Sequence, residues 1–299
     1  MASVAETTVA AAPRRKRGPV LHFIGRLFRE KPLGAAGAVV FMLFLFCGIF
    51  ADVLAPYGMN QISPLNRLKP PSWAFPFGTD NLGRDMLSRC LYGAQLSVII
   101  GFCAAGIATI ISVFLGIVSG YLGGKFDLVL QRFVDAWMSF PDLIILIVVV
   151  SVVGPGMPQI IVTLGLLLGI AGSRIIRGAV VSVRENMYVH AAQSTGASTF
   201  RILWRHILPN VMAPVIVLFT TRVGTVILAE SGLSFLGLGV PPPAPTWGGL
   251  LSGSGRTFML QGPWLALAPG LCLTIVVYAT NMFGDALRDL LDPRMRGSR

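Results

Sequence analysis

Residues 90–124 read CLYGAQLSVIIGFCAAGIATIISVFLGIVSGYLGG and contain no charged side chain. A membrane-spanning helix needs about 20 apolar residues, so this interval suits one span with extended ends and is too short for two. Other charge-free intervals lie on both sides of it, at residues 33–51, 143–173, 206–221 and 257–284. The pattern predicts an all-α polytopic membrane protein.

The composition agrees with a membrane protein. Of the 299 residues, 54% are hydrophobic and 12% are charged, with a mean hydropathy of +0.73, whereas soluble proteins carry about 25% charged residues. The net charge of +11 comes from basic residues clustered at segment ends, and none form a basic face interleaved with aromatic residues, so nucleic-acid binding is not expected. The four cysteines form no CxxC pair or disulfide framework.

Glycine and proline divide the long apolar intervals. Residues 154–158 read GPGMP and should split the interval 143–173 into two helices joined by a tight turn. The GxxxG pairs at 116–120 and 165–169 place small residues on one helix face and favour close packing between helices of this chain. Six spans are therefore predicted, at about residues 33–54, 94–118, 134–153, 159–178, 211–231 and 265–284.

Charge counting supports the span at 134–153, which is interrupted by Pro141 and carries two aspartates. With six spans, 18 Lys and Arg residues lie on the cytoplasmic side and five on the other side, with Arg222 inside the membrane. Without this span the count is 10 inside and 13 outside, which contradicts the positive-inside tendency. Both termini are therefore expected in the cytoplasm.

The chain then divides into five regions. Residues 1–18 are expected to be disordered because of their Ala, Thr and Pro content, and the apolar run at 33–51 is longer than a signal-peptide core of about 7–15 residues. Asp80 is predicted to cap a surface helix outside the membrane, and Trp247 and Trp264 are expected at the membrane interface. The regions are a basic cytoplasmic segment (1–32), the first span (33–54), an extracytoplasmic loop (55–93), the transmembrane core (94–284, with an extracytoplasmic cap at 232–264) and a cytoplasmic tail (285–299).

One polar segment interrupts the apolar sequence. Within the segment 185–210, residues 190–210 read HAAQSTGASTFRILWRHILPN. Ala191, Ala192 and Gly196 would let another backbone approach closely, Gly196 can bend the chain between two short helices, and Pro209 should end the second helix. These features favour a surface on which a partner protein docks over a catalytic pocket.

The pattern A-A-x-x-x-G followed by L-P resembles the "EAA" cytoplasmic loop of permease subunits in ABC importers. Three further blocks resemble the peptide/nickel subfamily of those permeases, and together they cover nearly the whole chain. They are GTDNLGRD at 78–85, LGLG at 236–239 with Pro242, Pro245, Thr246, Trp247 and Gly248, and NMFGDALRD at 281–289 with LDPR at 291–294. The resemblance is closest to the second permease, the "C" component, of dipeptide and oligopeptide importers.

This resemblance implies a type I ABC importer permease fold, in which the 185–210 segment is the coupling helix that docks on a cytosolic ATPase. The implied partners are a homologous permease, two ATPase subunits that bind ATP and Mg, and an extracytoplasmic substrate-binding protein, all at a bacterial inner membrane. His190 replaces the glutamate that gives the loop its name, so docking is expected to depend on shape more than on a salt bridge. The expected contact residues are His190, Ala191, Ala192, Gln193, Gly196, Arg201, Arg205, Leu208 and Pro209.

Four charged residues within the predicted spans are candidates for a translocation path. Arg222 and Glu230 are eight positions apart, about 80° around an ideal helix, and could line a polar path for a zwitterionic peptide or pair with neighbouring helices. Asp135 and Asp142 are seven positions apart on one face of the predicted third span. For these two residues, gating and packing roles remain equally open.

Catalytic patterns are missing. The Gly-Gly-Lys within residues 120–126 lacks the spacing and the Ser or Thr of a P-loop, and the three histidines lack partners at metal-ligand spacing. We therefore expect a non-catalytic subunit that binds no metal or cofactor itself. Two alternatives remain: a related importer of nickel chelate, glutathione or another small solute, and a proton-coupled secondary transporter with Glu230 and Asp135 as its relay. The second is weakened by the absence of an inverted repeat.

Overall fold

The computed structural model describes residues 19–291, and its regular secondary structure in that range is helical, as predicted, with one isolated bridge between Thr79 and Asp85. The disorder predicted for residues 1–18 and most of the predicted tail lie outside the described residues. The α-helices are α1 Pro19–Glu30, α2 Pro32–Ile49, α3 Ala51–Leu54, α4 Met86–Leu122, α5 Gly124–Met138, α6 Asp142–Val153, α7 Met157–Arg184, α8 Met187–Ser194, α9 Thr199–Ile202, α10 Met212–Phe235, α11 Trp247–Leu250 and α12 Trp264–Leu291.

Helices α4 and α7 form the closest helix pair, and glycine makes it possible. A Cβ added at Gly116 would lie 2.7 Å from Ile176 Cβ, and one at Gly120 would lie 2.9 Å from Val180 Cβ. On the facing helix, a Cβ at Gly169 would lie 2.8 Å from Ile111 Cβ. Both GxxxG pairs therefore pack within the chain, as predicted, because backbones approach this closely only where no side chain intervenes.

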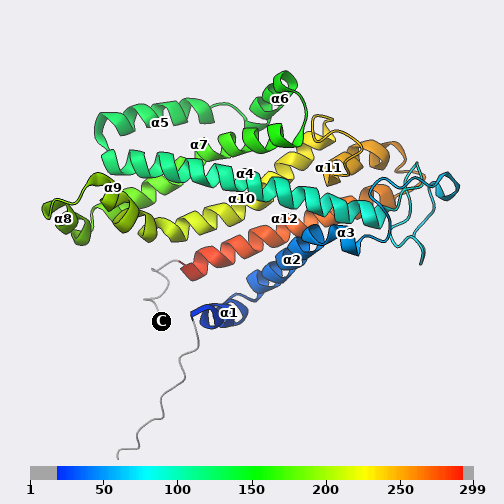
Figure 1. Ribbon diagram of the computed structural model, residues 1–299, viewed down its shortest axis with the longest axis horizontal. Helices are drawn as coiled ribbons and strands as arrows, with labels where there is room; N and C mark the ends of the chain where they lie inside the picture. Colours follow the sequence, from blue (N-terminus) through cyan, green and yellow to red (C-terminus); the bar gives the residue numbers. More distant parts are fainter. Residues whose placement is uncertain (1–18, 292–299) are drawn as a thin grey trace, which may run out of the picture.

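Helices α2, α10 and α12 pack around the other side of α4 (Figure 1). An aromatic cluster fills the space between them: the Phe41 ring of α2 lies 6.1 Å from Phe102 of α4 and 5.7 Å from Phe283 of α12. Arrangements of this kind add about 0.5–1.5 kcal/mol per pair beyond the area they bury. The cluster holds α2 against the helices that follow.

Within residues 19–291, five helices are long and apolar enough to cross a membrane, and α5 and α6 add a sixth crossing if they count as one span. Five of the predicted spans match long helices, although α4 is much longer than the predicted 94–118. The third predicted span differs from the structure. Residues 139–141 break it, and α5 and α6 meet at 81°, because Pro141 cannot donate the backbone hydrogen bond that would continue α5. Helix α6 alone, at about 18 Å, is shorter than a hydrocarbon core of about 30 Å.

The surface helix predicted with Asp80 as its cap is wrong. Asp80 Oδ1 accepts the backbone N–H groups of Leu82 and Arg84 at 2.8 and 3.0 Å, which closes a turn. The cap is Asp85, whose carboxylate accepts the Ser88 N–H at 2.7 Å at the start of α4. Residues 86–93 therefore form the first turns of a membrane helix, and the preceding loop contains only the 3₁₀ turn Pro64–Asn66.

The predicted cap at 232–264 contains a proline-rich loop, α11 and a π-helical turn, Leu251–Gly255. Trp247 was expected at the membrane interface but is 2% exposed. Its indole N–H donates to the Cys90 carbonyl at 3.0 Å, and its ring lies against Phe44. Trp264 is partly buried and donates to the Thr79 carbonyl at 3.1 Å. Trp247 therefore joins the cap to α4, and Trp264 joins it to the loop between α3 and α4.

The long helices run between two different ends (Figure 1). Helices α8 and α9 lie at one end, which we call the α8 end, together with the end of α4 and the start of α5. Helix α11 and the loop between α3 and α4 lie at the opposite end, the α11 end. The predicted docking segment at 185–210 and the predicted cap at 232–264 therefore lie at opposite ends of the molecule.

Candidate functional site

The 185–210 segment forms a bent pair of short helices. After α8, Gly196 adopts φ +77°, a left-handed conformation that glycine takes without strain. Helix α9 then starts at Thr199, where the Ser198 side chain caps the Arg201 N–H at 3.4 Å. The predicted bend at Gly196 is confirmed.

Pro209 does not end the helical path as predicted. The chain continues from α9 through a π-helical turn, Leu203–Ile207, and a 3₁₀ turn, Leu208–Val211, directly into α10. Pro209 lies in the first turn of the 3₁₀ segment, where a missing N–H costs little. The segment is therefore joined to a membrane helix without a flexible loop, so a displacement of one can be passed to the other.

The inner face of the segment is anchored in the helix bundle. Val189, Ile202 and Ile207 are at most 1% exposed and pack in one cluster with Ile176 and Val180 of α7. Burying an aliphatic side chain of this size contributes about 1.5–3 kcal/mol. The segment is thus a fixed part of the fold.

The outer face exposes apolar side chains that sequence reasoning missed. Met187, Phe200 and Trp204 are 87%, 76% and 66% exposed. The Phe200 and Trp204 rings stack with 6.4 Å between centroids and 6° between planes. A sequence signal existed, since two aromatic residues four positions apart lie on the same face of a helix. Exposed aromatic clusters of this kind mark surfaces that bind other proteins.

The predicted contact residues divide between the two faces. Ala192 and Leu208 pack on the buried cluster beneath the segment, so they support it from inside. The Gln193 amide donates to Tyr121 Oη at 3.3 Å and also connects the segment to α4. The outward-facing members of the set, all exposed, are His190, Ala191, Gly196, Arg201, Arg205 and Pro209.

The two aspartates of the predicted third span do not share a helix face. Asp135 lies in α5 and forms ion pairs with Arg174 of α7 and, at 3.6 Å, with Arg132. Asp142 is the exposed first residue of α6, beyond the break, where a carboxylate is favoured by the helix dipole. A second pair, missed by sequence reasoning, joins Asp127 Oδ1 to Arg177 Nε at 2.6 Å. Charged pairs therefore hold α5 against α7.

Arg222 and Glu230 are both buried in α10, and they form no ion pair with each other. Arg222 is 6% exposed and donates to Ser112 Oγ at 3.0 Å and to the Leu168 carbonyl. Glu230 is 1% exposed and accepts from Ser234 Oγ at 2.6 Å. Each is held by neutral partners, and their place in a translocation path stays a prediction.

The described residues contain no group of three or more His, Cys, Asp and Glu side chains that could hold a metal ion. The geometry instead offers a docking surface at the α8 end, formed by Met187, Phe200 and Trp204 with the polar residues around them. Docking, unlike catalysis, needs only such a surface on a firm support.

Comparison with known proteins agrees with this geometry. Residues 112–297 match a family model described as "Binding-protein-dependent transport system inner membrane component", and residues 24–71 match one described as "N-terminal TM domain of oligopeptide transport permease C". The resemblance inferred from the sequence motifs is confirmed.

Curated relatives cover most of the chain. A dipeptide transport system permease of Alkalihalophilus pseudofirmus is 38% identical over 90% of this chain and 88% of its own length. An oligopeptide transport system permease of Bacillus subtilis is 38% identical over the same shares. A glutathione transport system permease of Escherichia coli is 38% identical over 92% of this chain and 91% of its own.

Proposed function

The chain belongs to the family of binding-protein-dependent transport system inner membrane components, and from this premise we propose that it is a permease subunit of an ATP-driven importer of short peptides. Its role is non-catalytic. The substrate class is supported by the names of the relatives, which include dipeptide, oligopeptide and glutathione permeases. Glutathione is itself a tripeptide, so all three names describe one chemical class.

The proposed assembly divides the work of transport among several chains. A homologous permease pairs with this one to enclose the path, two cytosolic ATPases hold ATP and Mg, and an extracytoplasmic binding protein delivers the peptide. Closure of the ATPases would move the coupling segments and rotate the helices between inward-facing and outward-facing states. The protein would lie in a bacterial inner membrane with both termini in the cytoplasm, which the asymmetric distribution of Lys and Arg supports.

The observation that carries the proposal is the exposed aromatic pair on a rigid support. Phe200 and Trp204 are largely exposed, while Ile202 and Ile207 from the same stretch are at most 1% exposed. A surface that is apolar outside and anchored inside can bind an ATPase and transmit its movement to α10. The secondary-transporter alternative is not favoured, because the proposed relay residues are engaged separately, Asp135 with Arg174 and Glu230 with Ser234.

The test is co-purification of the assembled transporter. In a strain producing every subunit, the double substitution Phe200→Ala with Trp204→Ala should reduce the ATPase recovered with the permease more than about tenfold and abolish ATP-driven peptide uptake. Trp73→Ala is the control, since Trp73 is a fully exposed aromatic residue in the loop between α3 and α4, at the α11 end. Undiminished ATPase recovery from the double variant would refute the docking role.

A further inference from the structure

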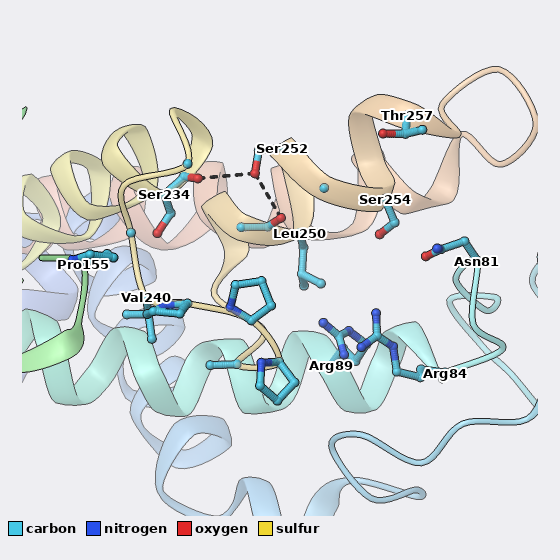
Figure 2. A pocket seen from close by; sticks show the side chains of 18 of the residues that line it. Asn81, Arg84, Arg89, Pro155, Ser234, Val240, Leu250, Ser252, Ser254 and Thr257 are labelled. Carbon is cyan, nitrogen blue, oxygen red and sulfur yellow. Dashed lines mark hydrogen bonds between the residues drawn. The ribbon is translucent and has the colours of Figure 1, made fainter. Parts of the chain in front are cut away.

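A cavity of about 530 Å³ opens at the α11 end, between the start of α4, the proline-rich loop and the π-helical turn after α11 (Figure 2). We call it the outer pocket. Cavities of roughly 300–1,000 Å³ suit small-molecule ligands. It lies on the side where an external binding protein would release its cargo.

Two arginines form one wall of the outer pocket. Figure 2 shows the guanidinium groups of Arg84 and Arg89 close together at the cavity. Arg84 Nε lies 2.6 Å from Asp80 Oδ2, and Arg89 Nε lies 3.9 Å from the same oxygen. The Asp80 carboxylate therefore lies within ion-pair distance of both arginines, and Arg84 is the nearer of the two.

Arg89 is the less satisfied of the two. It is 5% exposed, its Nε has no hydrogen-bond partner, and its Nη1 reaches the Met59 carbonyl only at 3.5 Å. Asp85 caps α4 through one carboxylate oxygen, Oδ2, which accepts from Ser88, and its buried Oδ1 has no hydrogen-bond partner among the described residues, so it forms no bond with Arg89. Burying a guanidinium whose N–H groups lack acceptors costs free energy. An anion in the pocket would lower this cost by accepting hydrogen bonds from Arg89.

The remaining lining is neutral. It includes the hydroxyls of Ser254 and Thr257, the amide of Asn81 and a run of glycine and proline backbone, and no described lining residue is acidic. Guanidinium groups bind carboxylates in a planar, two-point fashion. Hydroxyl, amide and backbone groups suit the peptide bonds that follow a carboxylate. The lining thus has one cationic site beside a neutral polar surface.

We propose that the outer pocket receives the short peptide on its way into the membrane and that Arg84 and Arg89 bind its terminal carboxylate. This inference rests on the proposed function, because it assumes a peptide cargo. It adds a named substrate contact besides the candidates Arg222 and Glu230, and it makes the pocket selective for peptides with a free carboxyl end.

The experiment uses the complete importer in proteoliposomes with its binding protein, and Ala-Ala as the probe. Thr257 is exposed and lines the pocket, so Thr257→Asp adds a negative charge where the fold tolerates change, while Thr257→Asn is its uncharged match. The aspartate variant should lower the initial rate of Ala-Ala uptake about tenfold to a hundredfold, whereas the asparagine variant, which keeps a neutral polar side chain in the lining, should lower it less than about threefold.

Arg89→Gln should cause a loss of similar size, with partial recovery in Arg89→Lys, which restores charge but not the planar two-point contact. Arg256→Gln is the control, because Arg256 is exposed in the same cap and does not line the pocket. Where Ala-Ala amide is also transported, its uptake should be insensitive to Arg89→Gln. The binding protein is identical throughout, so its own preference cancels in the comparison.

Equal uptake by the aspartate and asparagine variants of Thr257 would overturn the proposal. A second result would also overturn it. If Arg89→Gln abolished the ATPase stimulation caused by peptide-free binding protein, the pocket would bind an acidic side chain of that protein and not the peptide. Failure of the proposed function has a different signature: the unaltered importer would show no ATP-dependent Ala-Ala uptake at all.

Discussion

Gly83 and Gly196 lie at opposite ends of the molecule with nearly the same backbone angle, φ +75° and +77°, but their surroundings differ. A Cβ at Gly83 would lie 1.8 Å from the Ser63 carbonyl oxygen, whereas a Cβ at Gly196 would meet nothing within 4 Å. The α11 end is filled by its own chain around a defined pocket. The α8 end leaves space beside its exposed aromatics, as a docking surface requires.

The largest effect should come from filling the open space at the α8 end. Gly196→Trp should reduce peptide uptake about a hundredfold, because a bulky side chain blocks the ATPase, while an added Cβ at this position meets no atom of this chain within 4 Å. Gly196→Ala carries the same left-handed backbone strain, about 1–2 kcal/mol, and should keep most of the uptake. Initial uptake rates in proteoliposomes measure both. Similar rates for the two variants would mean that no partner occupies this space.

A stability effect comes next, at the α11 end. Gly83→Ala combines left-handed strain with a clash against the Ser63 carbonyl, so the free energy of unfolding should fall by about 3 kcal/mol. Thermal unfolding in detergent measures the change. Gly58→Ala is the control in the same loop, since its added Cβ would be 3.8 Å from the nearest atom. An unchanged unfolding temperature for the Gly83 variant would show that this end is less tightly filled than the structure indicates.

The smallest effect concerns the ion pairs formed by α5. Asp127→Asn removes a carboxylate that Arg177 contacts through two nitrogens and should cost about 1 kcal/mol, since both side chains are partly exposed. Arg132→Gln, at a side chain 77% exposed and 3.6 Å from Asp135, should cost less than about 0.5 kcal/mol. Detergent melting curves that rank the two in reverse would contradict the role of Asp127 in holding α5 to α7.

Sequence reasoning was most reliable where one physical effect dominates. Charge-free intervals located the long helices, because a charged residue in lipid is costly. The small residues at Gly116 and Gly120 predicted close packing, and Gly196 predicted a bend. Each of these inferences depends on a local property of the chain.

Sequence reasoning was wrong where contacts between residues far apart in the chain determine the structure. Asp80 and Asp85 are equally good caps in sequence, but Arg84 engages Asp80 and leaves Asp85 to start α4. A tryptophan in this sequence context is typical of a membrane interface, but Trp247 is buried, because its indole N–H donates to the Cys90 carbonyl of α4. The spacing of Phe200 and Trp204 places them on one helix face, but whether that face is exposed depends on which face Ile202 and Ile207 bury, and the sequence alone does not show this.

The contacts of Arg222 bear on how the protein is made. Its partners, Ser112 and the Leu168 carbonyl, belong to α4 and α7, which precede α10 in the chain and leave the ribosome first. A lone arginine at mid-membrane costs about 2.5–3.5 kcal/mol on insertion scales, and Gly172 of α7 keeps clear the space its side chain fills. Synthesis in this order lets each nascent α10 enter lipid beside acceptors already in place, so assembly of the bundle follows the direction of translation.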